Sequence, residues 1–121
     1  MAKILVVDDE LSDLETITFL LEKERHHVVA VSDGAKAFDV LKKNGFDLIL
    51  LDIKMPTLSG YDLLRLMREK VNHHIPMVYV SIVPKQDVDM TDIDGFIQKP
   101  FSPEVFISYV KKALAKKKRK A

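Results

Sequence analysis

The stretch Asp47–Pro56, DLILLDIKMP, decides the fold of this chain. Its four aliphatic residues, Leu48 to Leu51, run continuously and do not alternate with polar residues. This pattern is typical of a strand buried on both faces of a parallel sheet. The run ends directly in a carboxylate, Asp52, and packing alone gives no reason for a charge at that position. Asp52 is therefore either an incidental loop residue or the group that the strand exists to hold.

Similar apolar runs recur along the chain. Those at 4–7 and 77–80 are as continuous as Leu48–Leu51, while the weaker ones at 28–31 and 95–98 predict edge strands. Segments with helical spacing of apolar residues separate them, so the sequence predicts an α/β fold with a parallel sheet and right-handed crossovers. Five such units in 121 residues fit a flavodoxin-like, doubly wound, five-stranded parallel sheet of order 2-1-3-4-5 with flanking helices.

Several signals mark the expected helix ends. Ser12 with Glu15 has the spacing of a capping box for the first helix, and Asn44-Gly45 is a usual helix C-cap. The sequence SPE at 102–104 predicts the start of the last helix. Between 82 and 94 the chain has little helical periodicity, so the fourth helix of the fold is predicted to be short or irregular.

Length and composition favour one domain, residues 1–121, with a basic tail at 116–121. The net charge is +1, and the tail segment KKKRK (116–120) is wholly cationic, so the remainder is mildly acidic and is not expected to bind nucleic acid. The tail is interpreted as a solvated helix end; an anionic-partner contact and a linker to an output domain are the alternatives. Without cysteine, a signal-peptide core or a membrane-spanning run, we expect a cytoplasmic protein with no membrane partner.

The predicted sheet would bring polar side chains together at one edge. Asp8 and Asp9 follow the first strand, Asp52 follows the third, and Ser81 and Lys99 end the fourth and fifth. Three neighbouring carboxylates repel one another, so some would protonate or a cation would bind among them. An all-oxygen cluster favours Mg²⁺ or Mn²⁺ over zinc. A carboxylate nucleophile, a divalent cation, a lysine and a hydroxyl can together support phosphoryl transfer.

The motifs have a family resemblance. They are VVDDE at Val6–Glu10, LLDIKMP at Leu50–Pro56 with Gly60 following, Ser81 after an apolar strand, and QKPF at Gln98–Phe101. In this order they resemble a CheY-like response-regulator receiver domain, the phosphoacceptor of two-component signal transduction. Any one motif alone is weak, but the set spans nearly the whole chain.

The resemblance implies a role for each matching residue. Asp52 would accept a phosphoryl group from a histidine kinase or a phosphotransfer protein. The implied Mg²⁺ ligands are Asp8, Asp9, Asp52 and the backbone carbonyl of Lys54, and Mn²⁺ is a substitute ion. Lys99 would bind the phosphoryl group, with a cis Lys99–Pro100 peptide bond, and Ser81 and Phe96 would switch on phosphorylation.

The resemblance also implies a signalling protein and no conventional enzyme, because such domains catalyse only their own phosphorylation and dephosphorylation. Its switched face would control an unknown output partner or domain, including a second copy in a phosphorylation-dependent homodimer. One alternative is an interaction module of the same fold that no longer switches, which the altered segment after Ser81 keeps open. A phosphatase with an aspartate nucleophile ranks last, because Lys54 stands where that class usually has a second acid.

Overall fold

A computed structural model of the chain describes residues 1–71 and 74–120. The elements are, in order, β1 (Lys3–Val7), α1 (Leu11–Lys23), β2 (His27–Val31), α2 (Gly34–Lys43), β3 (Leu48–Leu51), α3 (Gly60–Lys70), β4 (Met77–Ser81), a 3₁₀ turn η1 (Lys85–Asp87), β5 (Gly95–Gln98) and α4 (Pro103–Lys120). The strands form one sheet of order β2-β1-β3-β4-β5, and every neighbouring pair is parallel. The predicted fold and strand order are confirmed.

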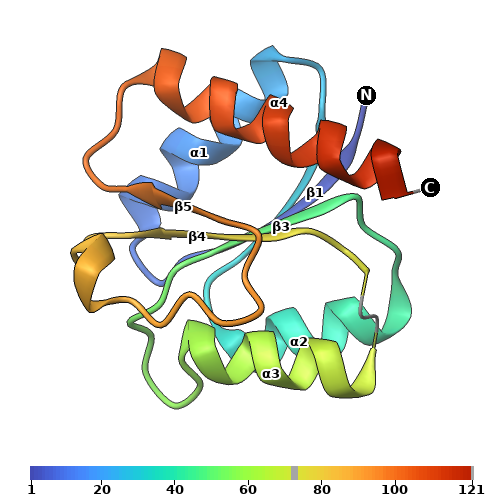
Figure 1. Cartoon of the computed structure of the whole chain (residues 1–121), viewed down its shortest axis with the longest axis vertical. Coiled ribbons are helices and arrows are strands. Elements are labelled where there is room, and N and C mark those ends of the chain that lie inside the picture. The colour runs from blue at the N-terminus through green and yellow to red at the C-terminus, as the bar shows by residue number, and fades with distance from the viewer. Residues whose placement is uncertain (72–73, 121) are drawn as a thin grey trace.

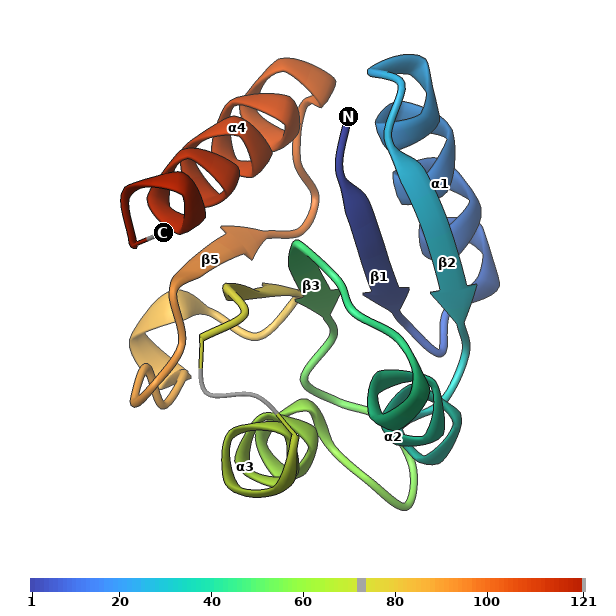
Figure 2. The same cartoon turned by 90° about the vertical axis from the view of Figure 1, so that its right-hand side faces the viewer.

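Helices cover both faces of the sheet. Helices α1 and α4 lie on one side, and α2 and α3 lie on the other (Figure 1; Figure 2 gives the perpendicular view). Because side chains alternate along a strand, Leu48 and Leu50 pack in the core under α1 and α4, whereas Ile49 and Leu51 pack in the core under α2 and α3. All four residues of β3 are buried, which explains why the run is continuously apolar.

One predicted helix cap is wrong, and a second has the predicted position but another conformation. Helix α1 begins at Leu11 with Glu10 as its N-cap, so Ser12 lies inside the helix and forms no capping box with Glu15; its hydroxyl donates instead to the Glu10 carboxylate at 3.1 Å. Helix α2 ends at the predicted position, with Asn44 as its C-cap, and the Asn44 N–H donates to the carbonyl of Val40 at 3.1 Å. The cap has extended backbone and not the left-handed conformation, and no glycine among the described residues has a positive φ. The capping-box signal at Ser12 is local, and it fails because α1 already begins at Leu11.

Other helix starts follow side-chain capping. Ser59 and Asp62 form a reciprocal capping box at α3: Asp62 N–H donates to the Ser59 hydroxyl at 3.2 Å, and Ser59 N–H donates to the Asp62 carboxylate at 3.1 Å. At α4 the predicted cap is present, because Val105 N–H donates to the Ser102 hydroxyl at 3.2 Å. The backbone of α4 continues through Lys120, while Ala121 of the basic tail lies outside the described residues. No described helix is long and apolar enough to cross a membrane.

The segment between β4 and β5 is irregular, as predicted, and contains only the short turn η1. It is nevertheless tied to α3. Arg68 donates to the backbone carbonyl of Asp92 at 3.2 Å and to the Asp94 carboxylate at 2.9 Å, and Tyr61 Oη accepts from Asp89 N–H at 3.2 Å. The side chain of Val88 is buried beneath it. Hydrogen bonds to α3 thus hold a segment that has no regular helix of its own.

Helix α3 also begins very close to the end of β3. Gly60 N–H donates to the carbonyl of Ile53 at 2.8 Å, and a Cβ built on Gly60 would lie 2.2 Å from the backbone oxygen of Asp52. Only a residue without a side chain permits this approach. The glycine therefore helps to fix where Asp52 leaves the sheet.

We predict that Gly60→Ala lowers the free energy of unfolding by about 2 kcal/mol, because the methyl group forces Asp52 and the start of α3 apart. Gly45→Ala is the matched control, since a Cβ at Gly45 meets nothing within 4 Å. Urea denaturation of both variants tests this. Equal stability of the two variants would contradict the close-approach argument.

The tie between α3 and the irregular segment gives a second prediction. Arg68→Ala leaves the half-buried Asp94 carboxylate without this partner, so we expect a loss of about 2 kcal/mol in the free energy of unfolding. Arg65→Ala breaks an exposed pair with Asp62 (Nη1 to Oδ1, 3.6 Å) and should cost less than about 0.5 kcal/mol. Hydrogen exchange at 87–94 should rise in the first variant only; unchanged exchange there would overturn the prediction.

Candidate functional site

Sheet register places the first acidic groups. Val7 of β1 pairs with Leu51 of β3, so the next residues, Asp8 and Asp52, leave the sheet side by side. The Asp52 N–H donates to the carbonyl of Val7 at 2.9 Å, which continues the ladder by one step. The rigid, fully buried strands therefore set the position of both aspartates.

Asp9 completes an acidic cluster. Oxygen atoms of Asp8, Asp9 and Asp52 all lie within 4.8 Å of one another. Asp8 is 1% exposed and Asp52 is 7% exposed, whereas Asp9 faces solvent. A hard divalent cation with retained water molecules suits this donor set, because all three ligands are carboxylate oxygens and one side is open. The predicted acidic triad is brought together as a site suited to Mg²⁺.

Burial perturbs the acids of this cluster. Burial raises the pKa of Asp52 from 3.8 to about 6; Lys99 opposes this shift, and the charges of Asp8 and Asp9 add to it. Burial likewise raises the pKa of Asp8, and its hydrogen bond with Lys99 only partly offsets the effect. Without a cation, Asp8 and Asp52 thus bind protons more readily than free carboxylates do. A bound cation would remove that tendency and leave Asp52 as an anionic nucleophile.

Lys99 brings the positive charge. It follows β5, whose last residue Gln98 pairs with Ser81, and Lys99 N–H donates to the carbonyl of Ser81 at 2.9 Å. The Lys99–Pro100 peptide bond is cis. Lys99 Nζ donates to Asp8 Oδ2 at 2.7 Å and to Asp13 Oδ2 at 2.8 Å, with the lysine side chain 8% exposed. Burial alone would lower the pKa of Lys99, but these hydrogen bonds outweigh it and raise the pKa.

Asp13 is a residue of the site that the sequence analysis missed. It lies in the first turn of α1, not at the end of a strand. An acid in a first helical turn has an ordinary explanation, since it interacts favourably with the helix dipole. Its contact with Lys99 joins residues 86 positions apart. The only signal in the sequence is its position just after the Asp8-Asp9 pair, which does not indicate a lysine partner.

The other residues predicted for the site lie outside the acidic cluster. Ser81 is fully buried at the end of β4, and its hydroxyl accepts from Val83 N–H at 3.2 Å. Phe96 of β5 is buried in the core under α2 and α3. The side chain of Lys54 is exposed, in the loop after β3 and on the wall of the neighbouring groove. Ile82, directly after Ser81, is 66% exposed.

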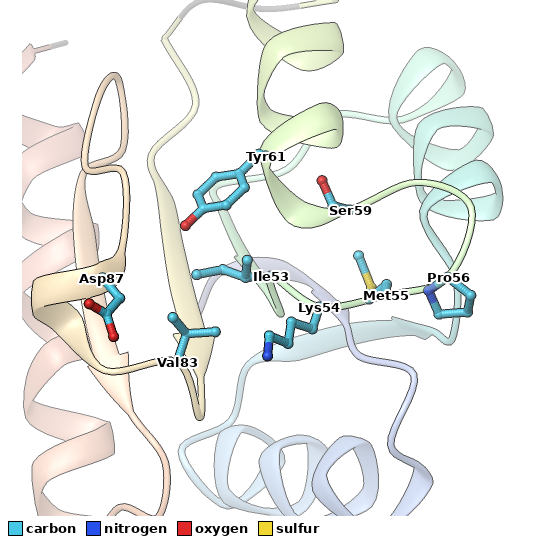
Figure 3. Close-up of a pocket in the computed structure, with 8 residues that line it drawn as sticks. All are labelled: Ile53, Lys54, Met55, Pro56, Ser59, Tyr61, Val83 and Asp87. Carbon is cyan, nitrogen blue, oxygen red and sulfur yellow. The ribbon is translucent and has the colours of Figure 1, made fainter.

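An open groove of about 640 Å³ lies next to this site. Figure 3 shows it between the loop that follows β3 and the segment that follows β4. The groove is lined by Ile53, Lys54, Met55, Pro56, Ser59, Tyr61, Val83 and Asp87. Tyr61 extends across it toward the irregular segment (Figure 3), in agreement with its hydrogen bond to Asp89. The groove therefore begins at Ile53 and Lys54, the residues that directly follow Asp52.

The raised pKa of Asp52 predicts a pH dependence of stability. Between pH 3.8 and about 6 the folded protein keeps a proton on Asp52 that the unfolded chain has lost, so stability decreases as pH rises through this window. In EDTA, Asp52→Asn should exceed wild type in free energy of unfolding by about 1–2 kcal/mol at pH 7, and by less at pH 4.

Denaturation at several pH values measures this difference. Asp39→Asn is the control, because the Asp39 carboxylate forms an exposed ion pair with Lys42 at 3.4 Å, and it should change stability by less than about 0.5 kcal/mol. A difference between wild type and Asp52→Asn that stays constant from pH 4 to pH 7 would contradict the burial argument. Excess Mg²⁺ should stabilise wild type more than the variant.

Comparisons with known proteins agree with this geometry. The family model "Response regulator receiver domain" matches residues 4–111. The uncharacterized transcriptional regulatory protein YcbL of Bacillus subtilis is 35% identical over 115 residues, which cover 91% of this chain and 50% of that protein. The chain thus spans about half the length of the curated relatives it matches.

Solved structures give the same assignment. A response regulator receiver domain protein from Clostridium thermocellum superimposes with a TM-score of 0.91 at 28% identity, covering 100% of both chains. The response regulator TrrA from Thermotoga maritima, solved in complex with Mg²⁺ and BeF, has a TM-score of 0.86 at 27% identity, covering 93% of this chain and 99% of that one. Receiver domains are signalling phosphoacceptors that interact with histidine kinases. This chain, with its acidic pocket at the ends of β1 and β3, belongs to the response-regulator receiver domain family.

Proposed function

We propose that this chain is the phosphoacceptor of a two-component system and that Asp52 accepts a phosphoryl group from a histidine kinase or a phosphotransfer protein in the cytoplasm. One observation carries the proposal: the carboxylates of Asp8, Asp9 and Asp52 converge within 4.8 Å, and Lys99 is paired to the same cluster. Membership of the receiver family supports it, as does the relative TrrA, which was solved with Mg²⁺ and BeF.

The proposed transfer step uses the groups of this site. A carboxylate oxygen of Asp52 attacks the phosphorus, the bond from phosphorus to the donor histidine nitrogen breaks, and that nitrogen keeps the electron pair. Mg²⁺, or Mn²⁺ in its place, would neutralise charge on the transferred oxygens when held by Asp8, Asp9, Asp52 and the backbone carbonyl of Lys54. Lys99 adds a second, fixed positive charge, so the protein acts mainly by positioning and electrostatics.

The same residues suggest how phosphorylation of Asp52 would change the surface that a partner recognises. Ser81 now accepts a hydrogen bond from Val83 N–H. With a phosphoryl group on Asp52, the hydroxyl would instead donate to a phosphoryl oxygen. Phe96, two positions after the irregular segment ends at Asp94, would respond by repacking and alter the surface formed with α4. An output partner, an output domain or a second copy of this chain would recognise the altered surface.

One observation favours a second candidate function, that of an interaction module that does not switch. The segment after Ser81 is fixed to α3 through Tyr61 and Arg68, so movement of Ser81 has to strain or release these hydrogen bonds. A receiver-fold interaction module would bind partners through this fixed surface and would not switch. Amide NMR with a phosphoryl mimic separates the two functions.

We predict that Mg²⁺ with beryllofluoride, a phosphoryl mimic, shifts the amide NMR signals of the acidic site, Val83, Phe96 and α4. Asp52→Ala is the control and should show no beryllofluoride response, because it lacks the ligand oxygen. Shifts confined to the acidic site would favour the interaction module. No response in wild type, or the same response in Asp52→Ala, would refute phosphoacceptance at Asp52.

A further inference from the structure

The charge of Lys99 is divided between two carboxylates from different parts of the fold. Its Nζ atom donates to Asp8 at 2.7 Å and to Asp13 at 2.8 Å. Within residues 1–71 and 74–120, the Asp52 carboxylate accepts one hydrogen bond, from Ile53 N–H at 2.8 Å. The ion pairs of Lys99 in the same residues are with Asp8 and Asp13, and not with Asp52. Lys99 is thus held toward β1 and α1, and not on the atom that the proposed reaction modifies.

We propose that Asp13 is a positioning residue that competes with the phosphoryl group for Lys99 and so lowers the affinity of the site for that group. The inference rests on the proposed function, because it concerns how the same site binds its phosphoryl group. Asp13 is not one of the three clustered carboxylates, and its ion pair is with Lys99, so it acts through Lys99. It lies outside the residues that the sequence motifs identify.

The two partners of Lys99 differ in how easily they can release it. Asp8 is 1% exposed, so without its lysine this buried carboxylate would depend on the hydrogen bond from Glu10 N–H at 2.9 Å and on a bound cation. Asp13 is 38% exposed, so water can replace the lysine at little cost. When a phosphoryl group arrives, the contact with Asp13 is therefore the one that yields. A lysine suits this exchange, since its ammonium group is a compact charge on a flexible stem.

A purely structural role for Asp13 makes the opposite prediction. As an acid in the first turn of α1 it stabilises the helix N-terminus. Removing it would then lower stability and leave the affinity for a phosphoryl mimic unchanged or weaker. If Asp13 competes for Lys99, removing its charge lowers the free energy of unfolding slightly and raises the affinity of the site for a phosphoryl mimic. The sign of the affinity change separates the two roles.

The test measures the dissociation constant of beryllofluoride at saturating Mg²⁺ by NMR titration of the whole chain. We expect Asp13→Asn to bind about two- to fivefold more tightly than wild type, the range that a partly exposed ion pair supplies. Asp13→Glu keeps the charge within reach of Lys99 and should restore an affinity near that of wild type. The initial rate of phosphorylation by a small acyl-phosphate donor should rise in Asp13→Asn by a similar factor.

Glu10→Gln is the matched control for charge. Glu10 is also acidic, lies at the N-cap of the same helix and is exposed, but its carboxylate bonds Ser12 and not Lys99. Because beryllofluoride is an anion, removal of any nearby negative charge aids binding slightly, and this variant measures that effect. Asp13→Asn should exceed it clearly.

The outcomes distinguish a failure of the competition by Asp13 from a failure of the proposed function. If wild type binds beryllofluoride and Asp13→Asn binds no better than Glu10→Gln, competition by Asp13 is wrong while the proposed function stands. Weaker binding by Asp13→Asn would also overturn the competition and would indicate that Asp13 holds Lys99 in a productive position. If wild type fails to bind beryllofluoride at Asp52, the proposed function fails and this inference fails with it.

Discussion

Repulsion among three carboxylates at one edge of the sheet is the constraint on which the rest of this structure depends. Asp8 and Asp52 are nearly inaccessible to water, and Asp9 adds its charge from the solvent side. Burial of one such charge without a partner is costly, and burial of two side by side is costlier still. The fold tolerates them because Lys99 pairs with the cluster and because protonation or a bound cation can relieve the remaining charge.

The apolar strands make that arrangement rigid. Residues Leu48–Leu51 are buried between β1 and β4, and their register with β1 leaves no freedom in where Asp52 emerges. Gly60 then lets α3 start against the backbone of Asp52, so the loop that follows is fixed as well. A site held by strand ends and one glycine can keep its geometry while the charges within it change, which a phosphoacceptor requires.

The irregular segment after β4 shows how tertiary contacts replace secondary structure. It lacks a helix, yet Arg68 and Tyr61 of α3 supply hydrogen bonds to its backbone, and Val88 anchors it in the core. Its lack of periodicity could be predicted from the sequence, whereas its attachment could not. Arg68 and Asp94 carry no pattern that pairs them, because a contact between distant side chains depends on how α3 packs on the sheet.

Local sequence patterns predicted those elements whose formation depends on neighbouring residues. Apolar runs predicted the strands because parallel strands need two buried faces, and their order along the chain predicted the sheet and the acidic triad at its edge. Helix starts were predicted in part: the cap at Ser102 formed, but the capping box at Ser12 did not, because α1 starts directly at Leu11.

The sequence by itself therefore determined the buried strands and the α/β class, since periodicity and the alternation of strands with helices are local properties. The strand order, and with it the meeting of Asp8, Asp9 and Asp52, was predicted from the flavodoxin-like fold that such units usually adopt, and the pairing of β1 with β3 confirms it. Only the tertiary structure decided how Lys99 divides its charge. Its long side chain could reach several acids, and its choice of Asp8 and Asp13 depends on where the first turn of α1 lies over the sheet edge. That position results from packing between helix and strands, which no stretch of sequence records.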